Sequence, residues 1–275
     1  MVFHTLSFEI APGVRIGGGN PPILIAGPCV IEGLEMILRH VEFLVELTGK
    51  LGIPFIFKSS YDKANRTSGR SFRGPGLDGG MEIFARIKRD FGIPILTDAH
   101  SVAEVETVGE LVDVVQIPAF LCRQTDLLEA AARTGKTVNI KKGQWLAPED
   151  VPYLIEKVNN AGGERVVITE RGTTFGYNRL IVDYAGIVKM RSAGWPVIFD
   201  ATHSVQTPGS SGNKTGGDRT LAPYLAAAAA AVGIDGLFVE THEDPDNALS
   251  DGPNMIALAS LEPALRKFIV ISKLS

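Results

Sequence analysis

The sequence predicts an α/β protein, a (β/α)8 TIM barrel whose N-terminal end is closed by a short β-hairpin. Eight short apolar runs alternate with eight helical patterns along the 275 residues. Strict alternation favours parallel strands with outer helices, and eight strands close such a barrel. No break in composition interrupts the pattern. We therefore expect one domain over residues 1–275, with the hairpin in 1–20 and the barrel in 23–272; an open doubly wound sheet is the alternative.

The predicted elements are separated by recognisable turn and cap residues. A hairpin is expected at residues 7–10 and 14–17, around Pro12-Gly13. The predicted strands are 23–26, 54–57, 94–96, 114–117, 137–140, 166–169, 197–199 and 236–239. The predicted helices are 34–50, 80–91, 101–111, 124–134, 149–161, 180–193, 218–232 and 255–270. Glycines such as Gly52 and Gly92 lie where helices should end, and Thr125 or Asp126 is expected to cap the fourth helix.

Composition and charge limit the classes of function. The chain is 45% hydrophobic and 21% charged, as is typical of globular proteins. A net charge of -4 argues against a general nucleic-acid binder, and no apolar run is long enough to span a membrane. No signal peptide is evident at the N-terminus, and Cys29 and Cys122 form no disulfide framework. We expect a cytoplasmic protein that binds neither nucleic acid nor membrane.

Charged and polar side chains follow nearly every predicted strand. Active residues of such barrels come from the carboxyl ends of the strands. Here those ends bring together Lys58, Lys141 and Arg171. Buried charges are unfavourable unless they are paired or bind a ligand. The sequence therefore predicts a small anionic substrate carrying phosphate, carboxylate or both.

Two long loops are candidates for holding that anion. The loop after the second strand is rich in cations and hydroxyls, and it is either a solvated surface or an anion-binding segment. Residues 208–217 are rich in Gly and Ser and are expected to form a mobile lid whose amides could hold a phosphate. They are not a P-loop, because Pro208 and Asn213 replace the two required glycines.

A metal site is predicted from strand order. When the barrel closes, the eighth strand lies between the seventh and the first, so Glu240, His203 and Cys29 end three adjacent strands. Asp251 follows in the next loop. Thiolate, imidazole and two carboxylates suit one divalent ion such as Zn²⁺, Fe²⁺ or Mn²⁺.

Each predicted ligand also has a simpler interpretation. Cys29 could fill space in the core, His203 could act as a base, Glu240 could pair with a lysine, and Asp251 could be a turn residue. Asp200 could bind a metal-bound water or anchor a neighbouring lysine.

The motifs at these strand ends resemble one known family over residues 23–263. They are Ala26-Gly27-Pro28-Cys29, Phe57-Lys58-Ser59-Ser60, Lys63-Ala64-Asn65-Arg66-Thr67-Ser68, Ser71-Phe72-Arg73-Gly74-Pro75-Gly76, Gln116-Ile117-Pro118-Ala119-Phe120, Asp200-Ala201-Thr202-His203-Ser204-Val205-Gln206 and Leu249-Ser250-Asp251-Gly252-Pro253. The chain is similar to the 3-deoxy-D-manno-octulosonate 8-phosphate synthases. The resemblance implies a transferase that condenses phosphoenolpyruvate with D-arabinose 5-phosphate, in lipopolysaccharide synthesis. Cys29, where a metal-independent branch has asparagine, implies the metal-dependent branch, with one divalent ion per subunit and no organic cofactor.

The resemblance also implies roles for individual residues. The phosphoenolpyruvate site would comprise Lys58, Lys63, Gln116, Ala119, Lys141 and Arg171, with Phe120 beside it. The pentose phosphate would be held by Asn65, Arg66, Thr67 and Ser210 or Ser211. In the expected homotetramer Arg73 would reach a neighbouring active site. Asp98, His100 and Gln206 would complete the site at the carboxyl ends of the strands. The catalytic set implied is Lys58, Lys63, Asp98, His100, Lys141, His203 and Asp251.

Three other activities remain as alternatives at this point. The related 3-deoxy-D-arabino-heptulosonate 7-phosphate synthases use erythrose 4-phosphate as the acceptor. A sugar-phosphate sensor would bind without turnover. A Schiff-base aldolase could use Lys58 or Lys141 as its amine.

Overall fold

The computed structural model describes residues 4–65, 69, 71–211 and 214–275, and they form a closed parallel barrel. Its strands are β3 (Ile23–Gly27), β4 (Phe55–Lys58), β5 (Ile95–Asp98), β6 (Val114–Ile117), β7 (Thr137–Lys141), β8 (Val166–Glu170), β11 (Val197–Asp200) and β14 (Gly236–His242). Each pairs in parallel with its neighbours, and β11 pairs with β14 to close the barrel. The predicted fold class is confirmed, and the open doubly wound sheet is excluded.

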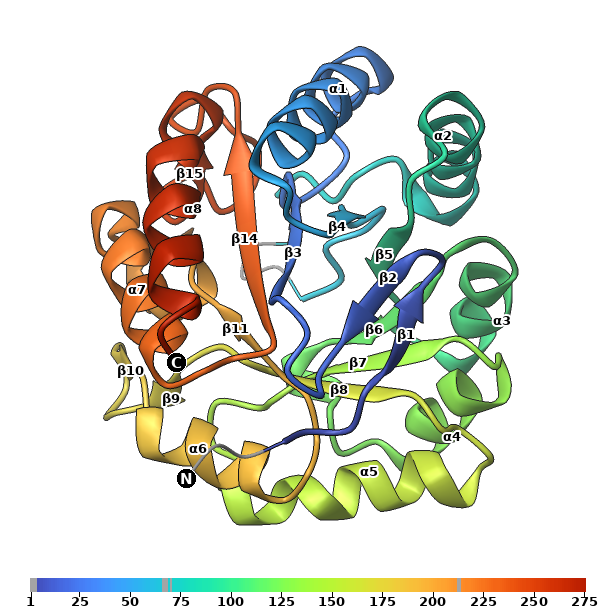
Figure 1. Ribbon diagram of the computed structural model, residues 1–275. Coiled ribbons are helices and arrows are strands. Elements are labelled where there is room, and N and C mark those ends of the chain that lie inside the picture. The colour runs from blue at the N-terminus through green and yellow to red at the C-terminus, as the bar shows by residue number, and fades with distance from the viewer. Residues whose placement is uncertain (1–3, 66–68, 70, 212–213) are drawn as a thin grey trace.

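Among the described residues, eight α-helices surround the barrel (Figure 1). They are α1 (Leu34–Leu51), α2 (Gly76–Phe91), α3 (Val102–Leu111), α4 (Thr125–Arg133), α5 (Val151–Asn160), α6 (Tyr184–Ser192), α7 (Ala222–Ala231) and α8 (Leu258–Ser272). Gly52 and Gly92 end α1 and α2 in the left-handed conformation, as predicted. The predicted cap of α4 is wrong: Gln124 occupies the cap position, and no side chain bonds there.

The N-terminal hairpin lies over one end of the barrel, as Figure 1 shows. It consists of β1 (Phe8–Ala11) and β2 (Val14–Ile16), paired antiparallel. Ile10 and Ile16 are buried in one cluster with barrel residues such as Ile25 and Phe238. The Thr137 hydroxyl donates a hydrogen bond to the carbonyl of Ile10 at 2.7 Å. Apolar packing thus seals the end of the barrel where the strands begin.

Smaller elements lie at the opposite end of the barrel, where the strands finish. They are the pairs β9 (Thr173–Thr174) with β10 (Leu180–Ile181) and β12 (Gln206–Ser211) with β13 (Lys214–Gly217), the strand β15 (Ile256–Ala257), and the 3-10 turns η1 (Ala119–Leu121), η2 (Pro148–Asp150), η3 (His203–Val205) and η4 (Arg219–Leu221). The segment 208–217, expected as an irregular loop, therefore lies largely in a β-hairpin. The Gly/Ser-rich composition of this segment disfavours strands, but backbone hydrogen bonds between β12 and β13 stabilise them.

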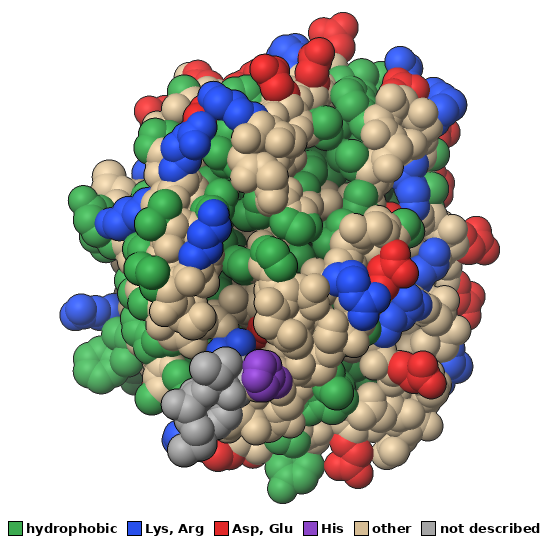
Figure 2. Space-filling view, in the orientation of Figure 1, with side chains coloured by type: hydrophobic (Ala, Val, Ile, Leu, Met, Phe, Trp, Pro, Cys, Tyr) green, Lys and Arg blue, Asp and Glu red, His purple; other side chains and the backbone are tan. Residues whose placement is uncertain are grey.

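None of the helices in the described part of the chain is long and apolar enough to cross a bilayer. On the face seen in Figure 2, acidic and basic side chains occur together.

Candidate active site

Strand alternation brings charge to the open end of the barrel. Successive side chains of a strand point to opposite faces, so residues two apart share a face. Ile56, Leu96, Val114, Ile198 and Phe238 pack inside the barrel in one apolar cluster. Two residues further along the same strands come Lys58, Asp98, Gln116, Asp200 and Glu240, all at most 7% exposed. These polar groups line or adjoin a cavity of about 760 Å³ at the carboxyl ends of the strands, where the active sites of such barrels lie.

The four predicted metal ligands converge beside this cavity. Donor atoms of Cys29, Glu240 and Asp251 lie within 4.8 Å of one another. The Nε2 atom of His203 lies 3.8 Å from Glu240 Oε2 and 3.8 Å from Asp251 Oδ2. Bonds of about 2.0–2.3 Å to a tetrahedral ion separate neighbouring donors by roughly 3.3–3.8 Å. Cys29, Glu240 and Asp251 thus form one group, and His203 lies beside its two carboxylates. The donor types suit one divalent ion, and the donor atoms would have to move closer together to bind it.

The surroundings of Cys29 favour a cation. Burial and the nearby Glu240 carboxylate raise the pKa of the Cys29 thiol far above its usual range. Its sulfur is 2.9 Å from the Ser250 hydroxyl. Lys63 and Lys58 already oppose this rise in pKa, and a metal ion would add the further positive charge that lets the thiol ionise.

Glu240 also pairs with a lysine, which was the simpler interpretation of this residue. Lys58 donates closely to Glu240 Oε1 and, at 3.2 Å, to the carbonyl of Cys29. Lys63 lies 4.0 Å from the same Oε1 and donates to Ser60 Oγ at 3.0 Å. Pairing with Lys58 does not prevent Glu240 from being a metal ligand, because its second oxygen, Oε2, faces His203.

Asp200 anchors both a lysine and a predicted ligand. Its Oδ2 accepts from Lys141 Nζ and, at 2.7 Å, from His203 Nδ1. Its Oδ1 accepts from Thr202 Oγ1 at 3.1 Å and from the backbone N–H of His203 at 2.9 Å. The bond to Nδ1 leaves His203 Nε2 facing the carboxylates. Of the two roles predicted for Asp200, the structure shows the lysine anchor.

Lys141 is a buried cation with a perturbed pKa. Burial lowers the pKa of Lys141 to about 8, while Asp200 opposes the shift. Its Nζ also lies 3.4 Å from the centre of the Phe238 ring. The group is therefore charged at neutral pH and close to titrating above it.

Arg171 offers hydrogen bonds to an anion. It is 6% exposed, and burial lowers its pKa. One nitrogen, Nη2, donates to Gln206 Oε1 at 2.5 Å, and Gln206 Nε2 donates to Asp251 Oδ2 at 3.2 Å. The other, Nη1, is buried with no hydrogen-bond partner among the described residues. A buried guanidinium with a free N–H matches phosphate or carboxylate.

Most of the predicted site residues line the cavity. These are Lys58, Lys63, Asn65, Asp98, His100, Gln116, Ala119, Phe120, Lys141, Arg171, His203, Gln206, Glu240 and Asp251. Arg73 does not line it and is 60% exposed, with its guanidinium paired to Asp62. Arg66 and Thr67 lie outside the described residues, as do the side chains of Ser210 and Ser211.

Sequence reasoning gave no site role to five polar residues of the cavity wall, Ser71, Gln144, Arg219, Asp246 and Ser250. Gln144 comes three residues after the end of β7, a position that could have suggested it. Ser250 reaches the site through the loop conformation, in which Asp251 has a left-handed φ of 49°. The turn interpretation of Asp251 is consistent with this conformation, but it did not point to Ser250.

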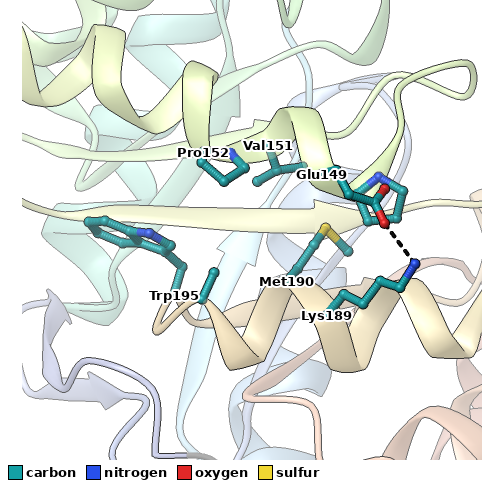
Figure 3. Close-up of a pocket in the computed structure, with 8 residues that line it drawn as sticks. Glu149, Val151, Pro152, Lys189, Met190 and Trp195 are labelled. Atoms are coloured by element: carbon teal, nitrogen blue, oxygen red, sulfur yellow. Dashed lines mark hydrogen bonds and ion pairs between the residues drawn. The ribbon is translucent and has the colours of Figure 1, made fainter.

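A second cavity, of about 160 Å³, lies between η2, the start of α5, and α6 (Figure 3). Its lining is mostly apolar, with Met190 and Trp195 prominent. Its two charged residues, Glu149 and Lys189, pair with each other at 2.6 Å. It therefore lacks the converging polar groups that mark a reactive site.

Comparison with known proteins gives one consistent result. Residues 5–271 match the DAHP synthetase I family. A protein from Trichlorobacter lovleyi named 2-dehydro-3-deoxyphosphooctonate aldolase is 57% identical over 92% of this chain and 93% of its own length. Proteins of the same name from Synechococcus sp. and Geobacter sp. are 56% and 53% identical, over 95% and 93% of this chain and 92% and 93% of their own lengths. The chain belongs to the DAHP synthetase I family.

Proposed function

We infer that this protein is a 3-deoxy-D-manno-octulosonate 8-phosphate synthase. It condenses phosphoenolpyruvate with D-arabinose 5-phosphate and water, and it releases phosphate. The observation that carries this conclusion is near-full-length similarity, at up to 57% identity, to proteins named 2-dehydro-3-deoxyphosphooctonate aldolase. These names support the octulosonate product over the heptulosonate alternative.

The cavity suits two phosphorylated substrates. Its volume of about 760 Å³ is in the range of small-molecule sites. Lys63, Lys141 and Arg171 supply positive charge to the phosphate and carboxylate of phosphoenolpyruvate. Asn65 also lines the cavity and would contact the pentose phosphate.

The reaction joins two carbon atoms without a Schiff base. C3 of phosphoenolpyruvate attacks the aldehyde carbon of the pentose, the aldehyde oxygen takes a proton, and water adds at C2. Phosphate then leaves by C–O cleavage of the tetrahedral intermediate, and the ketone forms. Lys141 and Arg171 stabilise the charge that moves onto the departing phosphate.

We propose that Cys29, His203, Glu240 and Asp251 hold one divalent ion, of the Zn²⁺, Fe²⁺ or Mn²⁺ type. Their convergence supports this, and Asp200 fixes the tautomer of His203 so that Nε2 is free to ligate. When bound, such an ion supplies Lewis acidity toward an aldehyde oxygen or a water molecule. No organic cofactor is needed for this chemistry.

The expected assembly is a homotetramer in the cytoplasm, which we propose from the family resemblance. Exposed apolar side chains near the cavity support a contact between subunits: Phe120 and Trp145 stack at 5.9 Å and are 56% and 52% exposed. Arg73 does not line its own cavity and is exposed, so it would be accessible to a neighbouring subunit. Both cysteines are free thiols, as is usual in a reducing compartment.

The decisive experiment measures phosphate release with each candidate aldose, together with the metal content of the purified protein. Turnover of arabinose 5-phosphate in preference to erythrose 4-phosphate is expected. The reverse preference would identify a heptulosonate synthase, and binding without phosphate release would identify a sensor. Covalent trapping by borohydride would reveal a Schiff-base aldolase. Sedimentation of the same sample tests the tetramer.

A further inference from the structure

A chain of hydrogen bonds leads from the cavity to helix α3. His100 Nε2 lies 3.0 Å from Asp98 Oδ2, and His100 Nδ1 lies 3.0 Å from Glu104 Oε2. The same Glu104 oxygen accepts a bond from the Tyr61 hydroxyl and another, at 3.0 Å, from the backbone N–H of His100. Asp98 and His100 line the cavity, whereas Glu104 lies at the first turn of α3, outside the barrel.

The His100 ring is held on both sides by carboxylates. Each ring nitrogen must donate a proton to satisfy these two contacts, so the ring is an imidazolium. Burial lowers the pKa of His100, but Asp98 and Glu104 outweigh it and raise the pKa to about 9. The Tyr61 ring packs edge-on to the imidazole at 5.7 Å and restricts its orientation.

Glu104 has a simpler interpretation as a helix cap. Ser101 caps α3 by accepting from the backbone N–H of Glu104 at 3.3 Å, and Ser-x-x-Glu is a capping-box sequence. In a capping box the Glu side chain bonds back to the N–H of the cap residue. Here it bonds instead to the backbone and ring of His100, one residue earlier. The carboxylate is thus directed toward the active site.

The hydrogen-bond chain ends in the cavity at Asp98, which presents a free acceptor. Asp98 is 7% exposed, and its Oδ1 is buried with no hydrogen-bond partner among the described residues. A buried carboxylate oxygen without a donor is unfavourable. Since Asp98 lines the cavity, a ligand hydroxyl or water would supply that donor. His100 occupies Oδ2 and therefore decides which oxygen remains available.

We propose that Glu104, assisted by Tyr61, is a positioning residue of the reaction that acts through His100 to hold Asp98 with its Oδ1 ready to accept from a substrate hydroxyl or the reacting water. The proposal rests on the condensation inferred above. It adds to the site two residues that do not touch the substrate.

The test compares Glu104→Gln with wild type in steady-state kinetics of the metal-loaded protein. The helix cap is the bond from the backbone N–H of residue 104 to Ser101 Oγ, so this change removes the charge of the side chain and keeps the cap. Loss of a hydrogen bond to a charged group corresponds to about a ten- to hundredfold drop in kcat/KM. If kcat/KM falls because KM for arabinose 5-phosphate rises, the donor to Asp98 is a sugar hydroxyl. If kcat/KM falls because kcat alone falls, the donor is the reacting water.

Three further variants separate a positioning role from a structural one. Tyr61→Phe, which removes only the hydroxyl, should lower kcat/KM about two- to tenfold, and it decides the question if Glu104→Gln does not fold. The matched control is Glu106→Gln, an exposed position on the same helix, which should match wild type. In an Asp98→Asn background Glu104→Gln should cause no further loss.

Wild-type kinetics in Glu104→Gln and Tyr61→Phe, or full additivity with Asp98→Asn, would overturn the proposal. Inactivity of the wild-type protein with both aldoses would instead refute the proposed function. The two failures are therefore distinguishable.

Discussion

Replacing Asp200 by Asn tests how one buried carboxylate organises the site. Asp200 is fully buried, and both of its oxygens accept hydrogen bonds from donors. An Asn side chain has one acceptor and one donor end. In one orientation its NH₂ group faces Lys141 Nζ and His203 Nδ1, and in the other it faces the Thr202 hydroxyl and the backbone N–H of His203. Either orientation opposes donors to donors.

The magnitude follows from these contacts. Breaking a buried ion pair by removing one partner costs about 3–5 kcal/mol. In a chain of this size that corresponds to a fall of roughly 6–20 °C in the melting temperature, at about 2–4 °C per kcal/mol. Where the Asn NH₂ faces Nδ1, His203 must move its proton to Nε2, which then cannot ligate. Losing such support typically weakens metal binding about 10–100-fold.

Thermal unfolding of the metal-free protein and calorimetric titration with Zn²⁺ measure the two effects separately. Asp126→Asn, at an exposed position of α4, is the matched control and should behave as wild type. If Asp200→Asn keeps both the melting temperature and the metal affinity of wild type, the anchoring role is wrong. If only the melting temperature falls, Asp200 holds Lys141 but does not set the tautomer of His203.

Three other predictions concern charge in the cavity. Cys29→Ala should abolish metal retention and most activity, as judged by elemental analysis and phosphate release; full activity of this variant after chelation would contradict the metal assignment. Arg171→Gln should raise KM for phosphoenolpyruvate at least about tenfold, because a charge-assisted bond is lost; an unchanged KM would place the anion elsewhere. Since burial lowers the pKa of Lys141 to about 8, kcat/KM for phosphoenolpyruvate should fall as pH rises through 8. The folded pKa lies below the unfolded value of about 10.4, so the unfolded chain binds more protons between these values, and the contribution of Lys141 to the free energy of unfolding should rise through that window.

The sequence predicted the barrel because its strands and helix ends obey local rules. Apolar runs ending in charged residues located β4 and β14, and glycines located the ends of α1 and α2. Closure of the barrel then placed Cys29 beside Glu240 without any knowledge of side-chain contacts. The predicted carboxyl end of β6 is exact, and those of the other seven barrel strands fall one to three residues short, since the periodicity says nothing about the last hydrogen bond of a ladder.

The remaining features depend on tertiary contacts. β12 and β13 pair although their composition suggests a loop. The choice between two roles for Asp200 required the position of Lys141, 59 residues away in the chain. Glu104 matches a helix-cap pattern, and only the structure shows that its carboxylate reaches His100. Such pairings join segments whose local sequences carry no sign of each other.

The apolar cluster that closes one end of the barrel determines where substrates enter. Interior residues such as Ile25 and Ile198 are completely buried, and the hairpin covers them from below. In the described part of the chain, the cavity therefore communicates with solvent at the end where the strands finish. A substrate held by Lys141 and Arg171 would therefore enter, and its product would leave, through that end of the barrel.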